Sequence, residues 1–381
     1  MSVTSARGFS AGGVYAGIKA SGDLDLALVD AGRPVPAAAV FTSNTVAAPP
    51  VHLSRRHISD GSARAVVLSS GCANAATGRR GEEAAEQTAA LVAARLGCEK
   101  TDVIVCSTGP IGGVVPVDRI EAGLGDLDLS ERGGGEAARA ILTTDSRAKE
   151  ETWEGPGFRV GGMAKGAGMI RPDMATMLAV VTTDADVPSP VLQETLREAA
   201  ARTFNALNID GCESTNDTLV LLASGASGVR PEAGDFGAGL EQVCRGLARQ
   251  MAEDAEGASR VVTIDLRGAA DDAAALTLAR AVADSALVRA SFYGADPNWG
   301  RVLAALGSTR QPFDPGSTSV AYEGVVVAEG GVDAGVDHGP VSEKMGGDFT
   351  VTVRVGDGPG TCSLLTTDLT PEYVRFNGER S

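Results

Sequence analysis

The chain has 381 residues, 43% of them apolar but only 4% aromatic, so it can form two domains with cores of small aliphatic side chains. Its formal net charge of −16 argues against nucleic acid or an anionic membrane surface as the main partner. No stretch has the apolar run of a signal peptide or of a membrane-spanning helix.

Cysteine and histidine usage excludes two further kinds of site. Six cysteines are scattered without a C-x-x-C pair, which is typical of reduced thiols in a cytoplasmic protein. The three histidines stand in unrelated contexts, so a histidine-based metal centre or catalytic triad is not expected.

The first half of the chain alternates strands and helices. Residues 1–60 have the pattern of turns and short strands. A strand at 63–70 leads through a glycine-containing loop to a helix over 82–96, whose first turn is acidic, as the helix dipole favours. A buried strand follows at 101–107, and a helical pattern returns at 135–142.

The second half continues the alternation after a turn-rich zone that precedes residues 185–190, and we place the softest domain boundary in this zone. The crossovers are too irregular for a doubly wound parallel sheet, so we expect an α+β or layered α/β fold of two lobes. The pattern predicts helices over 191–207, 236–257 and 272–290, and strands over 217–224, 259–268, 302–307, 317–328, 348–356 and 361–367.

The segment "KGAGMIRPDMATMLAVVTTDA" places Thr176 between a glycine-rich loop broken by Pro172 and an apolar run that predicts a buried strand. A threonine hydroxyl needs a base to become a nucleophile, and an N-terminal threonine can use its own amine, whose pKa is about 7.7–8.0. Thr176 would reach that state by attacking the Ala175 carbonyl and releasing the preceding peptide. From spacing alone, an ordinary threonine at a strand start remains the favoured interpretation.

Two other loops carry polar groups. "STGPIGG" (107–113) follows a buried strand, where a hydroxyl and backbone N–H groups can converge on a developing oxyanion. It is equally a simple strand-to-turn connection. "DPNWGR" (296–301) has the pattern of a capped turn before the strand at 302–307.

Several blocks together resemble the ornithine acetyltransferases, the self-cleaving glutamate N-acetyltransferases of the cyclic arginine pathway. They are "STGPIGG", "ILTTDSRAKE", "KGAGMIRPDMATML", "STNDT", "DAEG" and "DPNWGR", in this order, and the opening "GFSAGGVYAGIKASGDLDLALVD" and "SGCANAATG" are also similar. The resemblance runs over essentially the whole chain, and it favours the nucleophile interpretation of Thr176.

The resemblance implies cleavage between Ala175 and Thr176 into an α chain (1–175) and a β chain (176–381). Thr176 would take the acetyl group from N-acetylornithine and pass it to glutamate in a ping-pong cycle, with acetyl-CoA as a further possible donor. The implied assembly is a cytoplasmic α2β2 heterotetramer that needs no metal or organic cofactor. The implied fold is the layered αββα sandwich shared with the β-peptidyl aminopeptidases, with a smaller second lobe.

Site residues follow from the same blocks. Thr108 and Gly109 match the oxyanion hole of the family. Substrate-binding positions correspond to Thr143, Lys165, Thr176, Glu256, Asn377 and Ser381.

The C-terminus departs from the family pattern. The chain ends "YVRFNGERS", one residue shorter than the usual N-x-x-x-[ST]-[ST], with Arg380 before the terminal Ser381. This leaves open a transacetylase of a specialised pathway with a different acceptor. A self-cleaving amidohydrolase or aminopeptidase on the same scaffold, or a non-catalytic amino-acid-binding protein, would fit the same blocks.

Overall fold

The computed structural model describes residues 2–171 and 177–379. The chain forms two compact units, one from residues 1–204 and 212–251 and the other from 205–211 and 252–381. The boundary predicted in the turn-rich zone before residues 185–190 is therefore wrong, because residues 1–204 all belong to the first unit. No helix in the described ranges has the length and apolar character needed to cross a bilayer.

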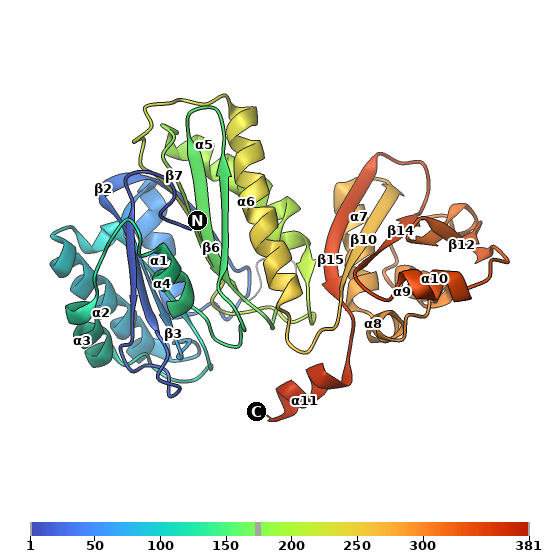
Figure 1. The fold of residues 1–381 in the computed structure, drawn as a ribbon, viewed down its shortest axis with the longest axis horizontal. Helices are drawn as coiled ribbons and strands as arrows, with labels where there is room; N and C mark the ends of the chain where they lie inside the picture. The colour runs from blue at the N-terminus through green and yellow to red at the C-terminus, as the bar shows by residue number, and fades with distance from the viewer. Residues whose placement is uncertain (1, 172–176, 380–381) are drawn as a thin grey trace. The chain divides into compact units, whose positions relative to one another are not determined.

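The first unit is built on an eight-stranded sheet with the order β4-β3-β2-β9-β7-β6-β5, to which β1 adds by pairing with β2. Figure 1 labels β2, β3, β6 and β7 of this sheet. Its strands are β1 (Ser10–Val14), β2 (Leu26–Phe41), β3 (Ser62–Ser70), β4 (Val103–Thr108), β5 (Lys149–Glu154), β6 (Arg159–Lys165), β7 (Leu178–Thr183) and β9 (Thr218–Ala223). Its helices are α1 (Pro49–His57), α2 (Gly78–Leu96), α3 (Val117–Asp126), α4 (Gly134–Ala140), α5 (Ser189–Arg202) and α6 (Ala233–Glu253).

The long strand β2 joins two halves of this sheet, because its first part pairs with β3 and its last five residues pair with β9. The two halves share one core, in which Val29 and Ile104 from one half meet Val180 and Val220 from the other. Helices α1, α2 and α3 pack on the outer face of the β2–β3–β4 half. Together with α5 and α6, which form the opposite helical layer, this confirms the predicted layered αββα arrangement.

Helices α5 and α6 cover the outer face of the other half. Gly162 of β6 allows the close approach of α6, since a Cβ atom there would lie 3.0 Å from both Val243 and Leu247. The side chain of Gln193 in α5 donates a hydrogen bond to the carbonyl of Ala39 in β2 (3.1 Å). Every residue of β7 and β9 is buried, so these two parallel strands lie at the centre of the unit.

The second unit has a seven-stranded sheet with the order β13-β12-β11-β14-β10-β15-β8. Its strands are β8 (Leu207–Asn208), β10 (Val261–Ala269), β11 (Ser319–Tyr322), β12 (Val325–Glu329), β13 (Val332–Asp333), β14 (Phe349–Arg354) and β15 (Gly360–Thr367). Its helices are α7 (Asp272–Asp284), α8 (Ala286–Tyr293), α9 (Trp299–Ser308), α10 (Gly339–Lys344) and α11 (Pro371–Glu379).

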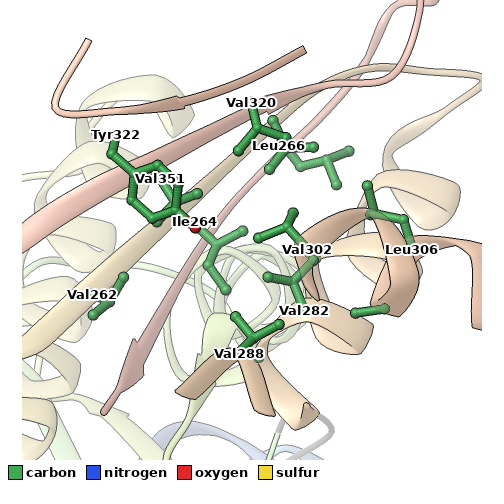
Figure 2. Packing of buried hydrophobic residues seen from close by; sticks show 14 of the residues in the cluster. Val262, Ile264, Leu266, Val282, Val288, Val302, Leu306, Val320, Tyr322 and Val351 are labelled. Atoms are coloured by element: carbon green, nitrogen blue, oxygen red, sulfur yellow. The ribbon is translucent and has the colours of Figure 1, made fainter. Parts of the chain in front are cut away.

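One face of this second sheet packs against helices α7, α8 and α9. Alternate residues of β10 point into the core, where Ile264 faces Val282 of α7 and Val302 of α9 (Figure 2). Phe292 of α8 meets Phe349 of β14 edge to face, with ring centroids 5.4 Å apart.

Three element predictions in the second half of the chain are wrong. The predicted strand 302–307 is helix α9, because Val302, Ala305 and Leu306 repeat with the helical period and the Asn298 side chain caps the helix by accepting from the Arg301 N–H (3.2 Å). The predicted helix 191–207 ends at Arg202, after which the chain passes into the second sheet. The predicted helix 272–290 is broken at Ser285, whose side chain caps α8.

Candidate functional site

The predicted oxyanion residues lie at the end of β4 in the first unit. Thr108 is the last residue of the strand and is buried, with 4% of its surface exposed. Gly109 has φ = +134°, and a Cβ atom there would lie 2.6 Å from the backbone nitrogen of Cys72. Only glycine fits this position without displacing the neighbouring backbone.

Lys165 ends β6 and reaches Thr108 from the other half of the sheet. Its ammonium group, 2% exposed, donates a hydrogen bond to Oγ1 of Thr108 (3.3 Å). An ammonium group can only donate, so the threonine oxygen accepts and its own proton points elsewhere. Among the described residues no group accepts the Thr108 hydroxyl proton, which leaves it able to donate to a bound oxyanion.

Asp145 links the other predicted residues of this unit to Lys165. Its buried carboxylate accepts from Nζ of Lys149 (2.6 Å) and from the backbone N–H groups of Gly166 (2.6 Å) and Thr143 (3.0 Å). Its Oδ2 lies 4.0 Å from Nζ of Lys165. The carboxylate therefore connects the loop after α4 to the ends of β5 and β6.

The charge of Asp145 is maintained in spite of its burial. Burial alone would raise the pKa of this carboxyl, but the Lys165 and Lys149 ammonium groups and the Gly166 N–H outweigh it and hold the pKa at about 2. Two buried cations thus face one buried carboxylate, and the cluster carries a net positive charge that suits an anionic substrate group.

The same edge of the sheet carries the start of β7. Lys165 of β6 pairs with Leu178 of β7, and Leu178 pairs with Thr218 of β9. Lys165, the last residue of β6, and Met177, which directly precedes β7, therefore lie at the same end of two adjacent strands. Ala175 and Thr176, the predicted cleavage site and nucleophile, lie outside the described residues, but Thr176 is bonded to Met177.

Asn216, which is not among the predicted site residues, connects two segments at this end of the sheet by hydrogen bonds. Nδ2 of Asn216 donates to the carbonyl oxygens of Ala73 (2.7 Å) and Ser107 (2.9 Å), which joins the loop before β9 to the end of β4. The family block "STNDT" contained this residue, but its bonding partners lie more than one hundred residues away in sequence.

The second unit brings two of the predicted substrate-binding residues together. Nδ2 of Asn377, on α11, donates to Oε2 of Glu256 (3.1 Å) and to the backbone carbonyl of Tyr373 (3.2 Å). Glu256 is half-buried and Asn377 is exposed. Ser381 lies outside the described residues.

Comparison with known proteins gives one consistent result. The model of the ArgJ family matches residues 10–381. The "Arginine biosynthesis bifunctional protein ArgJ" of Thermobifida fusca is 47% identical over 385 residues, covering 100% of both chains. The protein of the same name from Streptomyces coelicolor is 45% identical over 386 residues, again with 100% of both chains covered.

A crystal structure of the arginine biosynthesis bifunctional protein ArgJ from Bacillus halodurans is similar to part of the chain. The TM-score is 0.50 at 31% identity, and the match covers 52% of this chain but 96% of that one. The solved chain is therefore about half as long as the present one.

Proposed function

Because the chain belongs to the ArgJ family, the acetyltransferases of arginine biosynthesis, we propose that it carries the acetyl group from N-acetylornithine to glutamate on the hydroxyl of Thr176. The observation that supports the proposal is the buried Lys165–Thr108 pair, because Lys165 lies at the end of β6 that pairs with the start of β7. Formation of an acetyl ester divides one difficult transfer into two easier steps.

Self-cleavage would create the nucleophile. The Thr176 hydroxyl attacks the Ala175 carbonyl, the acyl group moves from nitrogen to oxygen, and water hydrolyses the ester. The products are an α chain of residues 1–175 and a β chain of residues 176–381 with Thr176 at its amino terminus. The half-length chain of the Bacillus halodurans relative supports this division.

In acetyl transfer the freed amine of Thr176 acts as the base for its own hydroxyl. The Thr108 hydroxyl proton and the Gly109 N–H stabilise the negative oxygen of the tetrahedral intermediate. Lys165 orients Thr108 by donating to its oxygen, and its charge favours the neutral form of the nearby amine. No step requires a metal ion or an organic cofactor.

The remaining substrate contacts are assigned by chemistry. Glu256, a half-buried carboxylate held by Asn377, suits the side-chain ammonium group of ornithine. Thr143 and Ser381 complete the proposed binding residues. Acetyl-CoA is the proposed second donor.

We place the enzyme in the cytoplasm as an α2β2 assembly of cleaved chains. The six cysteines, all within the described residues and none of them in a disulfide, suit a reducing compartment.

A donor and acceptor panel tests the proposed function. Purified protein is incubated with N-acetylornithine or acetyl-CoA and with glutamate or other amino acids, and free ornithine and acetylated products are measured. We expect ornithine release that depends on glutamate and yields an equal amount of N-acetylglutamate. Ornithine release at the same rate without an acceptor would indicate a hydrolase, and preference for another amino acid would indicate a specialised pathway.

A further inference from the structure

Asp217 is a buried carboxylic acid that the proposed mechanism does not use. It directly precedes β9, its surface is fully buried, and its Oδ1 accepts a hydrogen bond from the backbone N–H of Met177 (2.8 Å). Its Oδ2 is also buried and makes no hydrogen bond with any described residue. Burying a polar atom without a hydrogen-bond partner costs free energy of folding, so the unpartnered Oδ2 indicates a functional role for Asp217.

Asp217 contacts Met177, the residue that directly follows the proposed nucleophile. Met177 is held on both sides, since its N–H donates to Asp217 and its carbonyl accepts from the Thr218 N–H (3.1 Å). The nitrogen of Met177 is covalently bonded to Thr176. The carboxyl of Asp217 is therefore hydrogen-bonded to the residue that directly follows Thr176 in the chain.

The surroundings favour the protonated form of this acid. Burial raises the pKa of the Asp217 carboxyl well above its usual range and outweighs the opposing effects of the Met177 N–H, the Ser214 hydroxyl and the Lys165 charge. Because Oδ1 accepts from Met177, the acidic proton belongs on Oδ2.

We propose that Asp217 is the proton donor for self-cleavage and delivers its Oδ2 proton to the Thr176 nitrogen as that nitrogen leaves the Ala175 carbonyl. This proposal rests on the proposed function. In the step, the bond from the Thr176 oxygen to the Ala175 carbonyl carbon forms and the bond from that carbon to the Thr176 nitrogen breaks. The nitrogen gains one proton and becomes an amine. The hydroxyl proton of Thr176 passes to Asp217, which returns to its acid form, so no further reactant is needed.

The Asp217→Asn variant tests the proposal because asparagine keeps the size of the side chain and an oxygen that can accept from Met177. Freshly synthesised, labelled chain is followed over time on a denaturing gel. We expect self-cleavage to slow by about 100-fold or more, within the usual range for losing a positioned acid or base. Cleavage of the Asn variant at the wild-type rate would overturn the proposal.

Asp184→Asn is the matched control. Asp184 is a buried carboxylate at the opposite end of β7, where it accepts from the Arg159 N–H (2.8 Å), far along the strand from Met177. This variant should cleave as the wild type does, and thermal melting should show that both variants are folded. If the control slows equally, loss of any buried carboxylate explains the effect and the proposal fails.

A second pair of variants distinguishes the loss of the acidic proton from a change in side-chain packing. Asp217→Glu retains an acid and Asp217→Gln does not, while both side chains have the same added length. The Glu variant should cleave at least about tenfold faster than the Gln variant, and equal rates would contradict proton donation. Wild-type chain is followed in parallel: if it also stays intact, the proposed function fails, whereas a cleaving wild type with a cleaving Asn variant refutes only the role of Asp217.

Discussion

The Thr176→Ala variant should remain a single full-length chain and show no acetyl transfer. Removal of the hydroxyl removes the atom that attacks Ala175, so neither the break nor the new amino terminus can form. Without a nucleophile and its amine, the residual rate of transfer should fall by at least about a thousandfold. Gel electrophoresis and N-terminal sequencing of the purified variant measure cleavage, and ornithine release measures transfer.

Thr176→Ser provides the control, because serine keeps both the hydroxyl and, after cleavage, the amine. It should still divide into two chains and retain measurable transfer. An alanine variant that still divides between residues 175 and 176 would show that another group performs the cleavage.

The Asp145→Asn variant should lower the free energy of unfolding of the first unit by about 3–5 kcal/mol, the usual cost of removing one partner from a buried ion pair. The change removes the negative charge that faces the buried ammonium groups of Lys149 and Lys165. It also weakens the link between the Thr143 loop and Gly166, so acetyl transfer should decline as well.

Fluorescence can report this loss for the first unit alone. The chain has two tryptophans, of which Trp153 lies in the first unit and Trp299 in the second. Urea unfolding is therefore followed in a Trp299→Phe background. Asp186→Asn, which removes an exposed ion pair with Arg230, should change stability by no more than about 1 kcal/mol. A loss at Asp145 no larger than this would contradict a buried charge cluster.

The stability effect of Asp145 should also depend on pH. The folded pKa of about 2 lies below the usual value of about 3.9, so the carboxylate stabilises the fold above about pH 4. This contribution is lost as the pH falls toward 2. The difference between wild type and Asp145→Asn should therefore be constant near neutral pH and narrow in acid.

Much of the fold could be predicted because most strands are short apolar runs between glycine-rich turns. The strand at 101–107 and the strand at 217–224 agree with β4 and β9 to within two residues. The run at 302–307 was ambiguous because six apolar and small residues suit a buried strand or one side of a helix. The segment is helical in the structure because Val302 and Leu306 pack together into the core of the second unit. The residues that they contact there are distant in sequence, so no local pattern shows this packing.

The candidate site, like the fold, could be predicted from the sequence only in part. Family blocks pointed to Thr108, Lys165 and Thr143. In the structure Thr143 and Lys165 lie beside the Asp145 carboxylate, and Lys165 also donates to Thr108. The four-residue spacing of Asp145 and Lys149 was visible in "TTDSRAKE", but their complete burial was not. The contact of Asp217 with Met177 arises from the parallel pairing of β7 and β9 across 40 residues, which no local pattern encodes.

Mass spectrometry of the enzyme incubated with N-acetylornithine alone is the decisive experiment for Thr176. We expect a β chain that begins at Thr176 and gains one acetyl group on that residue, and addition of glutamate should remove it. An active enzyme whose chain is unbroken between residues 175 and 176, or an acetyl group on any other residue, would contradict it.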